Sequence, residues 1–155
     1  MTTGWRIVGA RHAAQAFDGE GARLNGGRWN SPGVRMVYTA ESPALATLEL
    51  LVQSGTAAPF PQFVLIAATF PDGAITRLGP DRLPAGWRAY PAPPELQQLG
   101  DSWIKAADSA VLQVPSAVLP MQSNFLLNPL HPSFGMVKLE APQLFELDLR
   151  LLPKP

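Results

Sequence analysis

Residues that break regular structure recur along the whole of this sequence. Its 155 residues include 17 prolines and 13 glycines, which are spread from end to end and form no single linker. Both residue types favour turns and interrupt helices and strands, so they divide the chain into short elements. The length is close to the commonest domain size and there is no internal repeat, so we expect one mixed domain over residues 1–155.

Composition excludes several classes of protein. Hydrophobic residues make up 46% of the chain and charged residues 15%, which is enough for a core and too apolar for disorder. The 12 basic residues balance the 12 acidic ones, so no broad positive field is available for nucleic acid. We therefore expect no direct nucleic-acid binding. A neutral, apolar chain does have surface to bury against a protein partner, or against a second copy in a homodimer.

The chain contains no cysteine, which excludes disulfides, thiolate zinc sites and cysteine nucleophiles. Its opening segment, MTTGWRIVGARHAAQ, has an early arginine and lacks the apolar run of a signal peptide. Apolar stretches elsewhere are too short to span a membrane. These features predict a soluble cytoplasmic protein that makes no membrane contact.

The distribution of apolar residues predicts more strands than helices. Residues 62–70 (QFVLIAATF) form a nearly continuous apolar run, typical of a strand inside a sheet. Residues 144–149 alternate apolar and acidic side chains, typical of a half-buried strand. The other predicted strands are residues 5–8, 34–39, 110–114 with 116–119 after a break at Pro115, and 136–140. Together with one strong helix, this set predicts the α+β class.

Three segments are expected to lack long regular elements. Residues 19–33 are rich in glycine and have no apolar period, so we predict a long loop. Residues 81–98 are irregular apart from a short helix near Glu95, and their proline-rich part at 90–96 is predicted to lie on the surface. Residues 124–128 have asparagine at both ends, which favours a turn.

Residues 43–54 are predicted to form the one strong helix. Ser42 can cap its amino end, Pro43 suits its first turn and Gly55 would end it. Apolar side chains surround the helix axis, so the helix should be buried, yet it carries the charged residue Glu49. Burying a carboxylate is costly unless it is paired or hydrogen-bonded. Glu49 is therefore expected either to pair with a buried arginine or to face a cleft.

The segment Gly26-Gly27-Arg28-Trp29-Asn30 is a second candidate site. Paired glycines allow close approach of the backbone to a ligand, and the planar fork of Arg28 suits phosphate or carboxylate. The segment matches neither a P-loop nor a dinucleotide-binding fingerprint, and an ordinary turn with an exposed arginine is the alternative. Tyr38 ends the strand that follows, where core or rim packing is the alternative role.

Other candidate chemistries find little support. Ser116 lacks the G-x-S-x-G motif of a serine hydrolase nucleophile. His12 and His131 are isolated and no carboxylates cluster with them, so we expect no metal site.

Four segments, taken together, resemble the RES-domain family in their order and spacing. They are GGRWNSPG at 26–33, VYTAESPALATLELLV at 37–52, VPSAV at 114–118 and NFLLNP with HP at 124–132. The resemblance runs from about Trp5 to Leu151. The family takes its name from an Arg, a Glu and a Ser, which correspond here to Arg28, Glu49 and Ser116.

This sequence departs from the family pattern at three positions. Gln53 replaces an expected histidine, Phe125 a common tyrosine and Ser133 a common aspartate. These departures leave open the shape of the cleft rim and the strength of the activity.

The resemblance implies a toxin of a bacterial toxin–antitoxin pair, whose partner is an antitoxin with an Xre-like helix-turn-helix domain. It implies a central, mostly antiparallel sheet similar to the ADP-ribosyltransferase fold, with NAD as the substrate and no metal. Three activities remain open, namely hydrolysis of NAD, phosphorolysis of NAD and ADP-ribosylation of a protein. All three break the same nicotinamide–ribose bond. A fourth alternative is an inactive co-repressor module, but the intact set of Arg28, Tyr38 and Glu49 argues against it.

The resemblance also suggests a role for each site residue. The reaction passes through an oxocarbenium-like transition state, which the Glu49 carboxylate can stabilise. Arg28 would pair with the diphosphate, and Tyr38 would offer an aromatic face to the nicotinamide. Ser116 and Asn124 would hydrogen-bond the ribose or the carboxamide.

Overall fold

A computed structural model describes residues 1–54 and 60–154 and contains one eight-stranded sheet. Its order is β4-β5-β6-β2-β1-β3-β7, and β8 also pairs with β3. The strands are β1 (Thr2–Gly9), β2 (Val37–Ala40), β3 (Phe63–Phe70), β4 (Ile75–Arg77), β5 (Val111–Pro115), β6 (Ser123–Leu127), β7 (Lys138–Leu139) and β8 (Gln143–Phe145). Among these strands only the β4–β5 pair is parallel. The predicted α+β class and mostly antiparallel sheet are therefore confirmed.

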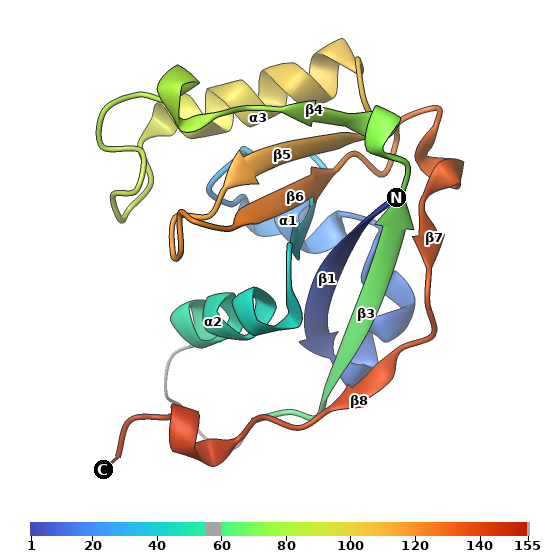
Figure 1. The fold of residues 1–155 in the computed structure, drawn as a ribbon, viewed down its shortest axis with the longest axis vertical. Coiled ribbons are helices and arrows are strands. Elements are labelled where there is room, and N and C mark those ends of the chain that lie inside the picture. Colours follow the sequence, from blue (N-terminus) through green and yellow to red (C-terminus); the bar gives the residue numbers. More distant parts are fainter. Residues whose placement is uncertain (55–59, 155) are drawn as a thin grey trace.

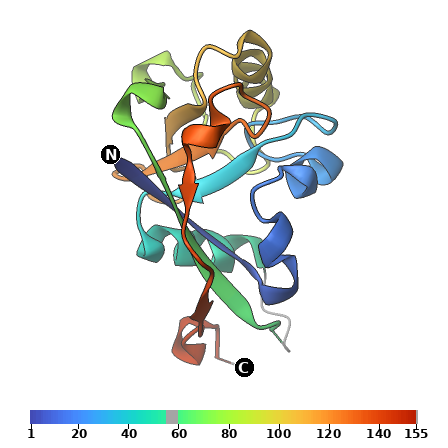
Figure 2. The ribbon, with the colours of Figure 1, turned by 90° about the vertical axis from the view of Figure 1, so that its right-hand side faces the viewer.

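Strand β3 contains the apolar run and lies inside the sheet, as predicted. It pairs with β1 along eight residues, and β7 and β8 follow its other side (Figure 2). Phe70 of β3 stacks edge-on against Phe125 of β6, with ring centroids 5.5 Å apart. The curl of the sheet is visible in Figure 1, where β4, β5 and β6 run across the view while β1 and β3 run down it.

The helices are α1 (Glu20–Asn25), α2 (Pro43–Ser54) and α3 (Pro94–Ala106). Short 3-10 turns cover Ala10–Gln15, Asp72–Ala74, Pro80–Arg82, Phe134–Met136 and Leu149–Leu151. Helix α3 packs over β5 and β6, where Leu96 and Trp103 meet Leu112 and Leu126. Helix α2 lies in the angle of the curled sheet beside β1 and β2 (Figure 1). None of the helices described is long and apolar enough to cross a membrane.

Helix α2 begins as predicted, because the Ser42 hydroxyl accepts the Leu45 amide at 3.1 Å. The expectation that the helix is buried is wrong. Leu45 and Ala46 are buried, but the side chains of Leu48 and Val52 are 39% and 65% exposed. The reason is that the sheet covers only one side of the helix. The predicted stop at Gly55 lies outside the described residues.

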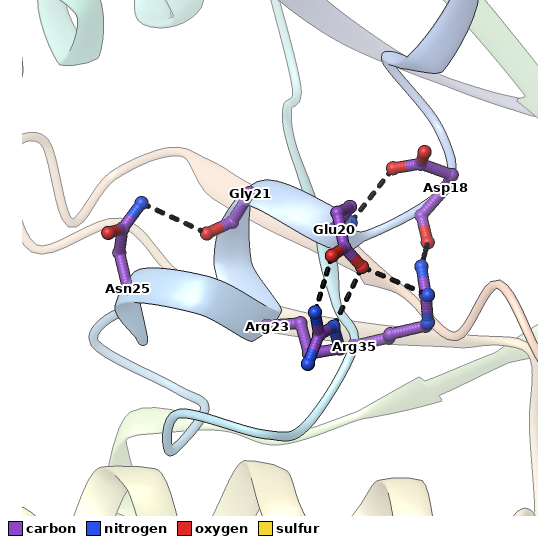
Figure 3. Close-up of polar contacts among 6 residues, drawn as sticks. All are labelled: Asp18, Glu20, Gly21, Arg23, Asn25 and Arg35. Atoms are coloured by element: carbon purple, nitrogen blue, oxygen red, sulfur yellow. Dashed lines mark hydrogen bonds and ion pairs between the residues drawn. The ribbon is translucent and has the colours of Figure 1, made fainter.

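Residues 19–33 are not a continuous loop, because α1 occupies Glu20–Asn25. Asp18 accepts the Glu20 amide at 2.8 Å, and the Glu20 carboxylate bonds Arg23 Nε at 2.7 Å and lies 2.9 Å from Arg35 Nη2. Figure 3 shows this cluster, in which Arg35 also donates to the carbonyl of Asp18. Charge pairs therefore stabilise a helix too short for any apolar period to indicate it.

The prediction of a short helix near Glu95 was right in position and wrong in extent. Helix α3 runs for thirteen residues, so the second half of the proline-rich segment 90–96 is helical. Its buried positions are Leu96, Gly100 and Trp103, which lie on one face at helical spacing. The glycine in that stripe weakened the helical pattern, although close packing requires it.

Two further predictions near the C-terminal half are wrong. Residues 124–128, expected to form a turn, lie largely in the inner strand β6, where Asn124 donates to the carbonyl of Thr39 at 3.3 Å. Residues 116–119, expected to form a strand, form a turn instead, because the Ser116 hydroxyl accepts the amides of Val118 and Leu119. In both cases side-chain amides and hydroxyls satisfy backbone groups in ways that residue polarity does not reveal.

Candidate functional site

A hollow lies between α2 and the strands β1 and β2. Its lining residues come from these three elements and are Trp5, Arg6, Ile7, Tyr38, Thr39, Ala40, Ala46, Glu49, Leu50 and Gln53. Two of the predicted site residues, Tyr38 and Glu49, are therefore brought together here. Six of the ten lining residues have apolar or aromatic side chains, and two carry opposite charges, Arg6 and Glu49.

Glu49 is held by Ser116. Its Oε1 accepts a hydrogen bond from the Ser116 hydroxyl at 2.9 Å. The same hydroxyl accepts the amides of Val118 and Leu119 at 3.1 Å each. Two donors already point at this oxygen, so its single proton is directed to Glu49, and the carboxylate is held as an acceptor. Of the two expectations for Glu49, a position that faces a cleft agrees with the structure, because Glu49 lines the hollow. No arginine lies within salt-bridge distance of it in the part of the chain described.

Arg28 lies next to the hollow, on the loop between α1 and β2, and does not line it. Its Nη1 donates to the carbonyls of Trp87 at 2.9 Å and Ala89 at 3.1 Å, and the side chain is half-buried. Burial lowers the pKa of the Arg28 guanidinium, and the negative charge of Glu49 opposes this effect. The guanidinium therefore lies within the electrostatic field of the carboxylate, although the two groups are not in contact.

Tyr38 connects the hollow to the loop of Arg28. Its hydroxyl donates to Asn30 Oδ1 at 2.6 Å and accepts the amide of Trp29 at 3.0 Å. A Cβ on Gly27 would lie 2.6 Å from this hydroxyl, so the glycine at this position leaves room for Tyr38. Burial raises the pKa of the Tyr38 phenol, which therefore stays protonated at neutral pH.

Asn124 and Ser116 are both buried and do not line the hollow. Ser116 reaches the site through Glu49. Asn124 lies opposite Ala40 in the β2–β6 pair, and its amide is directed to the backbone of β2.

Arg6 is a site residue that the sequence analysis missed. It lies on β1, lines the hollow and donates from Nη1 to the carbonyl of Tyr38 at 2.9 Å. Its buried Nε has no hydrogen-bond partner among the described residues, and burial lowers the pKa of the guanidinium. The available signal was an arginine within the apolar strand segment Trp5–Val8, the same kind of anomaly that identified Glu49.

The arrangement can stabilise a positive charge at Glu49 and bind an anion at the two arginines. Within residues 1–54 and 60–154, no three side chains of the metal-binding types converge.

The sequence matches the family described as the RES domain over residues 3–149. It is 39% identical over 130 residues to "Toxin Res" of Yersinia enterocolitica (84% of this chain, 86% of that protein). It is 36% identical over 160 residues to "Prs ADP-ribosylating toxin" of a Sphingobium species (99% of each). The crystal structure of the M. tuberculosis MbcT–MbcA toxin–antitoxin complex contains a similar fold, with a TM-score of 0.77 at 21% identity over 93% of this chain and 84% of that one.

Proposed function

Because this chain belongs to the RES-domain family, we propose that it is the toxin of a bacterial toxin–antitoxin system and cleaves the nicotinamide–ribose bond of NAD. The observation that carries the proposal is the Glu49 carboxylate, fixed by Ser116 in a hollow that also contains Arg6. NAD combines a cationic pyridinium with an anionic diphosphate. A site with one held carboxylate and nearby guanidinium groups is complementary to both charges.

Glu49 would act on the ribose. Nicotinamide leaves as a neutral molecule with the electron pair of the glycosidic bond, so no strong acid is needed at the leaving group. Positive charge then develops on the ribose ring, and a carboxylate already oriented toward it stabilises that charge without reorganisation. Water, phosphate or a protein side chain completes the reaction by bonding to the ribose carbon and losing a proton. The three hydrogen-bonding positions of the Ser116 hydroxyl are already occupied. Ser116 would therefore act on the reaction by holding Glu49.

The two arginines would bind the diphosphate. Arg28 keeps its charge at neutral pH despite its lowered pKa, and its planar fork suits phosphate oxygens. Arg6 lines the hollow and provides a second guanidinium there.

Tyr38 would contribute its ring rather than its hydroxyl. The hydroxyl is engaged with Asn30 and Trp29 and stays protonated, so it is poorly suited to move a proton. Tyr38 lines the hollow, and its ring would pack there against the flat nicotinamide. A contact of Asn124 with the ribose or the carboxamide stays a prediction.

The proposal is tested by product analysis. The antitoxin-free protein is incubated with NAD, with and without phosphate, and nicotinamide and the ribosyl products are separated. We expect nicotinamide release that Glu49→Gln abolishes. ADP-ribose would indicate hydrolysis, and a phosphorylated ADP-ribose formed only with phosphate would indicate phosphorolysis. Absence of nicotinamide release from the wild-type protein under all conditions contradicts the proposal.

ADP-ribosylation of a protein is the second candidate, and the Sphingobium relative named as an ADP-ribosylating toxin favours it. The bond broken is the same, and only the acceptor of the ribose carbon differs. Incubation with NAD labelled in the adenylate portion, in the presence of bacterial extract, separates the candidates. Label that becomes covalently attached to protein indicates transfer, whereas label found only in small molecules indicates hydrolysis or phosphorolysis.

We further propose a cytoplasmic location and an Xre-like antitoxin as the partner. An enzyme that consumes NAD would poison its own cell unless its site were blocked, and the M. tuberculosis structural neighbour is a toxin–antitoxin complex. The antitoxin would place a segment across the cleft near Arg28, with an acidic group that imitates phosphate. A charge-assisted contact of this kind contributes about 1.5–3 kcal/mol, with apolar contacts adding the rest.

Competition tests this mode of inhibition. The toxin–antitoxin complex should bind NAD poorly, and an antitoxin shortened by the inserted segment should bind the toxin without inhibiting it. Full NAD turnover by the intact complex would exclude blockage of the cleft.

A further inference from the structure

The loop that carries Arg28 (residues 26–33, the Arg28 loop) packs directly against α3. A Cβ on Gly100 of α3 would lie 1.7 Å from the carbonyl oxygen of Trp29, so the helix backbone touches the loop backbone. The indole of Trp29, next to Arg28 in the sequence, is only 2% exposed and packs with Leu96 and Trp103 of the same helix. Apolar packing therefore fixes one neighbour of Arg28 against α3.

Two polar residues of α3 hold the loop backbone on either side of Arg28. Gln97 Nε2 donates to the carbonyls of Gly27 at 2.9 Å and Asn30 at 3.1 Å. Asp101 accepts the Ser31 amide at 2.9 Å and the Ser31 hydroxyl at 2.6 Å. Gln97 and Asp101 are one turn apart on the same face of the helix, so they act on adjacent parts of the loop.

The base of the loop is held separately, by residues that precede and follow it. Glu20 pairs with Arg35 across the base (Figure 3). The side-chain amide of Asn30 donates from Nδ2 to the carbonyls of Ala22 and Val34 at 2.8 and 3.0 Å. Because the base of the loop has its own supports, the specific contribution of α3 is to position the part of the loop that carries Arg28.

We infer that α3 sets the backbone position of Arg28, whose Nη1 also donates to the carbonyls of Trp87 and Ala89, and that Gln97 and Asp101 are positioning residues for the site. This inference rests on the proposed function, in which Arg28 binds the diphosphate of NAD. A bidentate contact tolerates only small errors in the position of the fork, so a loop released from α3 binds the anion less tightly. The chemical step at Glu49 does not depend on this hold.

The test compares Gln97→Met and Asp101→Asn with matched changes one position along the same helix, Gln98→Met and Ser102→Ala, at exposed residues. We expect Gln97→Met to raise KM for NAD about tenfold with kcat within about twofold. Asp101→Asn keeps one acceptor and should raise KM less. Both control variants should leave KM unchanged.

A double-mutant cycle separates positioning from general packing. If Gln97 acts through Arg28, Arg28→Ala combined with Gln97→Met should have the same KM as Arg28→Ala alone. Additive effects on KM would overturn the inference. A lower melting temperature with unchanged KM would also overturn it, because the contact would then be structural only.

Failure of the proposed function would be seen separately. If the wild-type protein releases no nicotinamide, the proposed function fails, and hydrogen exchange of residues 26–33 decides whether α3 holds the loop. Faster exchange there in Gln97→Met but not in Gln98→Met supports the hold on Arg28. Equal exchange in the two variants overturns it.

Discussion

The hollow of Glu49 and the loop of Arg28 are adjacent, yet they are held in place in different ways. Glu49 lies on a helix that the sheet covers on one side only, and one hydroxyl, that of Ser116, fixes its carboxylate. The Arg28 loop is fixed by many contacts, from α3, from Tyr38 and from its own base. Glu49, which is proposed to stabilise the developing positive charge, therefore depends on a single contact. Arg28, which is proposed to bind the substrate, has several supports, so the loss of one should weaken binding without abolishing it.

The largest effect is expected at Glu49. Glu49→Gln keeps the shape and removes the charge, so kcat should fall by about 10²-fold or more while the melting temperature stays unchanged. Kinetics and thermal unfolding are measured together, with Glu146→Gln at an exposed position as the control. Near-normal turnover would show that the held carboxylate is not used. A large loss of stability with retained turnover would make it a packing feature instead.

Ser116 tests the dependence of Glu49 on one contact. Ser116→Ala removes the donor to Glu49 and the acceptor of two amides, so kcat should fall about tenfold and the free energy of unfolding by about 1–3 kcal/mol. Combining it with Glu49→Gln should add little further loss of kcat. Full additivity would mean that Ser116 contacts the substrate itself, as the sequence suggested.

Arg28 tests the other region. Arg28→Lys keeps the charge and loses the fork, so KM for NAD should rise about fivefold to tenfold with a smaller change in kcat. Arg82→Lys at an exposed position is the control. An unchanged KM would show that Arg28 does not bind the substrate and would remove the contrast between the two regions.

The two regions also differ in how far the sequence predicts them. The apolar run of β3, the Ser42 cap of α2 and the isolated charge of Glu49 are local patterns, and each identified its element or residue. Arg6 follows the same logic and could have been found. The supports of the Arg28 loop could not, because Gln97 and Asp101 lie about seventy residues away in the sequence. Tertiary packing, such as that of Trp29 against Gly100, brings them together.

Tyr38 belongs to both regions, and the smallest effect is expected there. Tyr38→Phe keeps the ring in the hollow but leaves the Trp29 amide and Asn30 Oδ1 without a partner. Because the phenol is not proposed to move a proton, kcat should stay within about twofold of the wild type. KM should rise about threefold, since α3 and the loop base still hold Arg28. Steady-state kinetics over a range of pH checks this, and Tyr38→Leu, which removes the ring, should raise KM further. A large fall in kcat for Tyr38→Phe, or a changed pH profile, would assign the hydroxyl to the chemical step. The reaction in the hollow would then depend on more than Glu49.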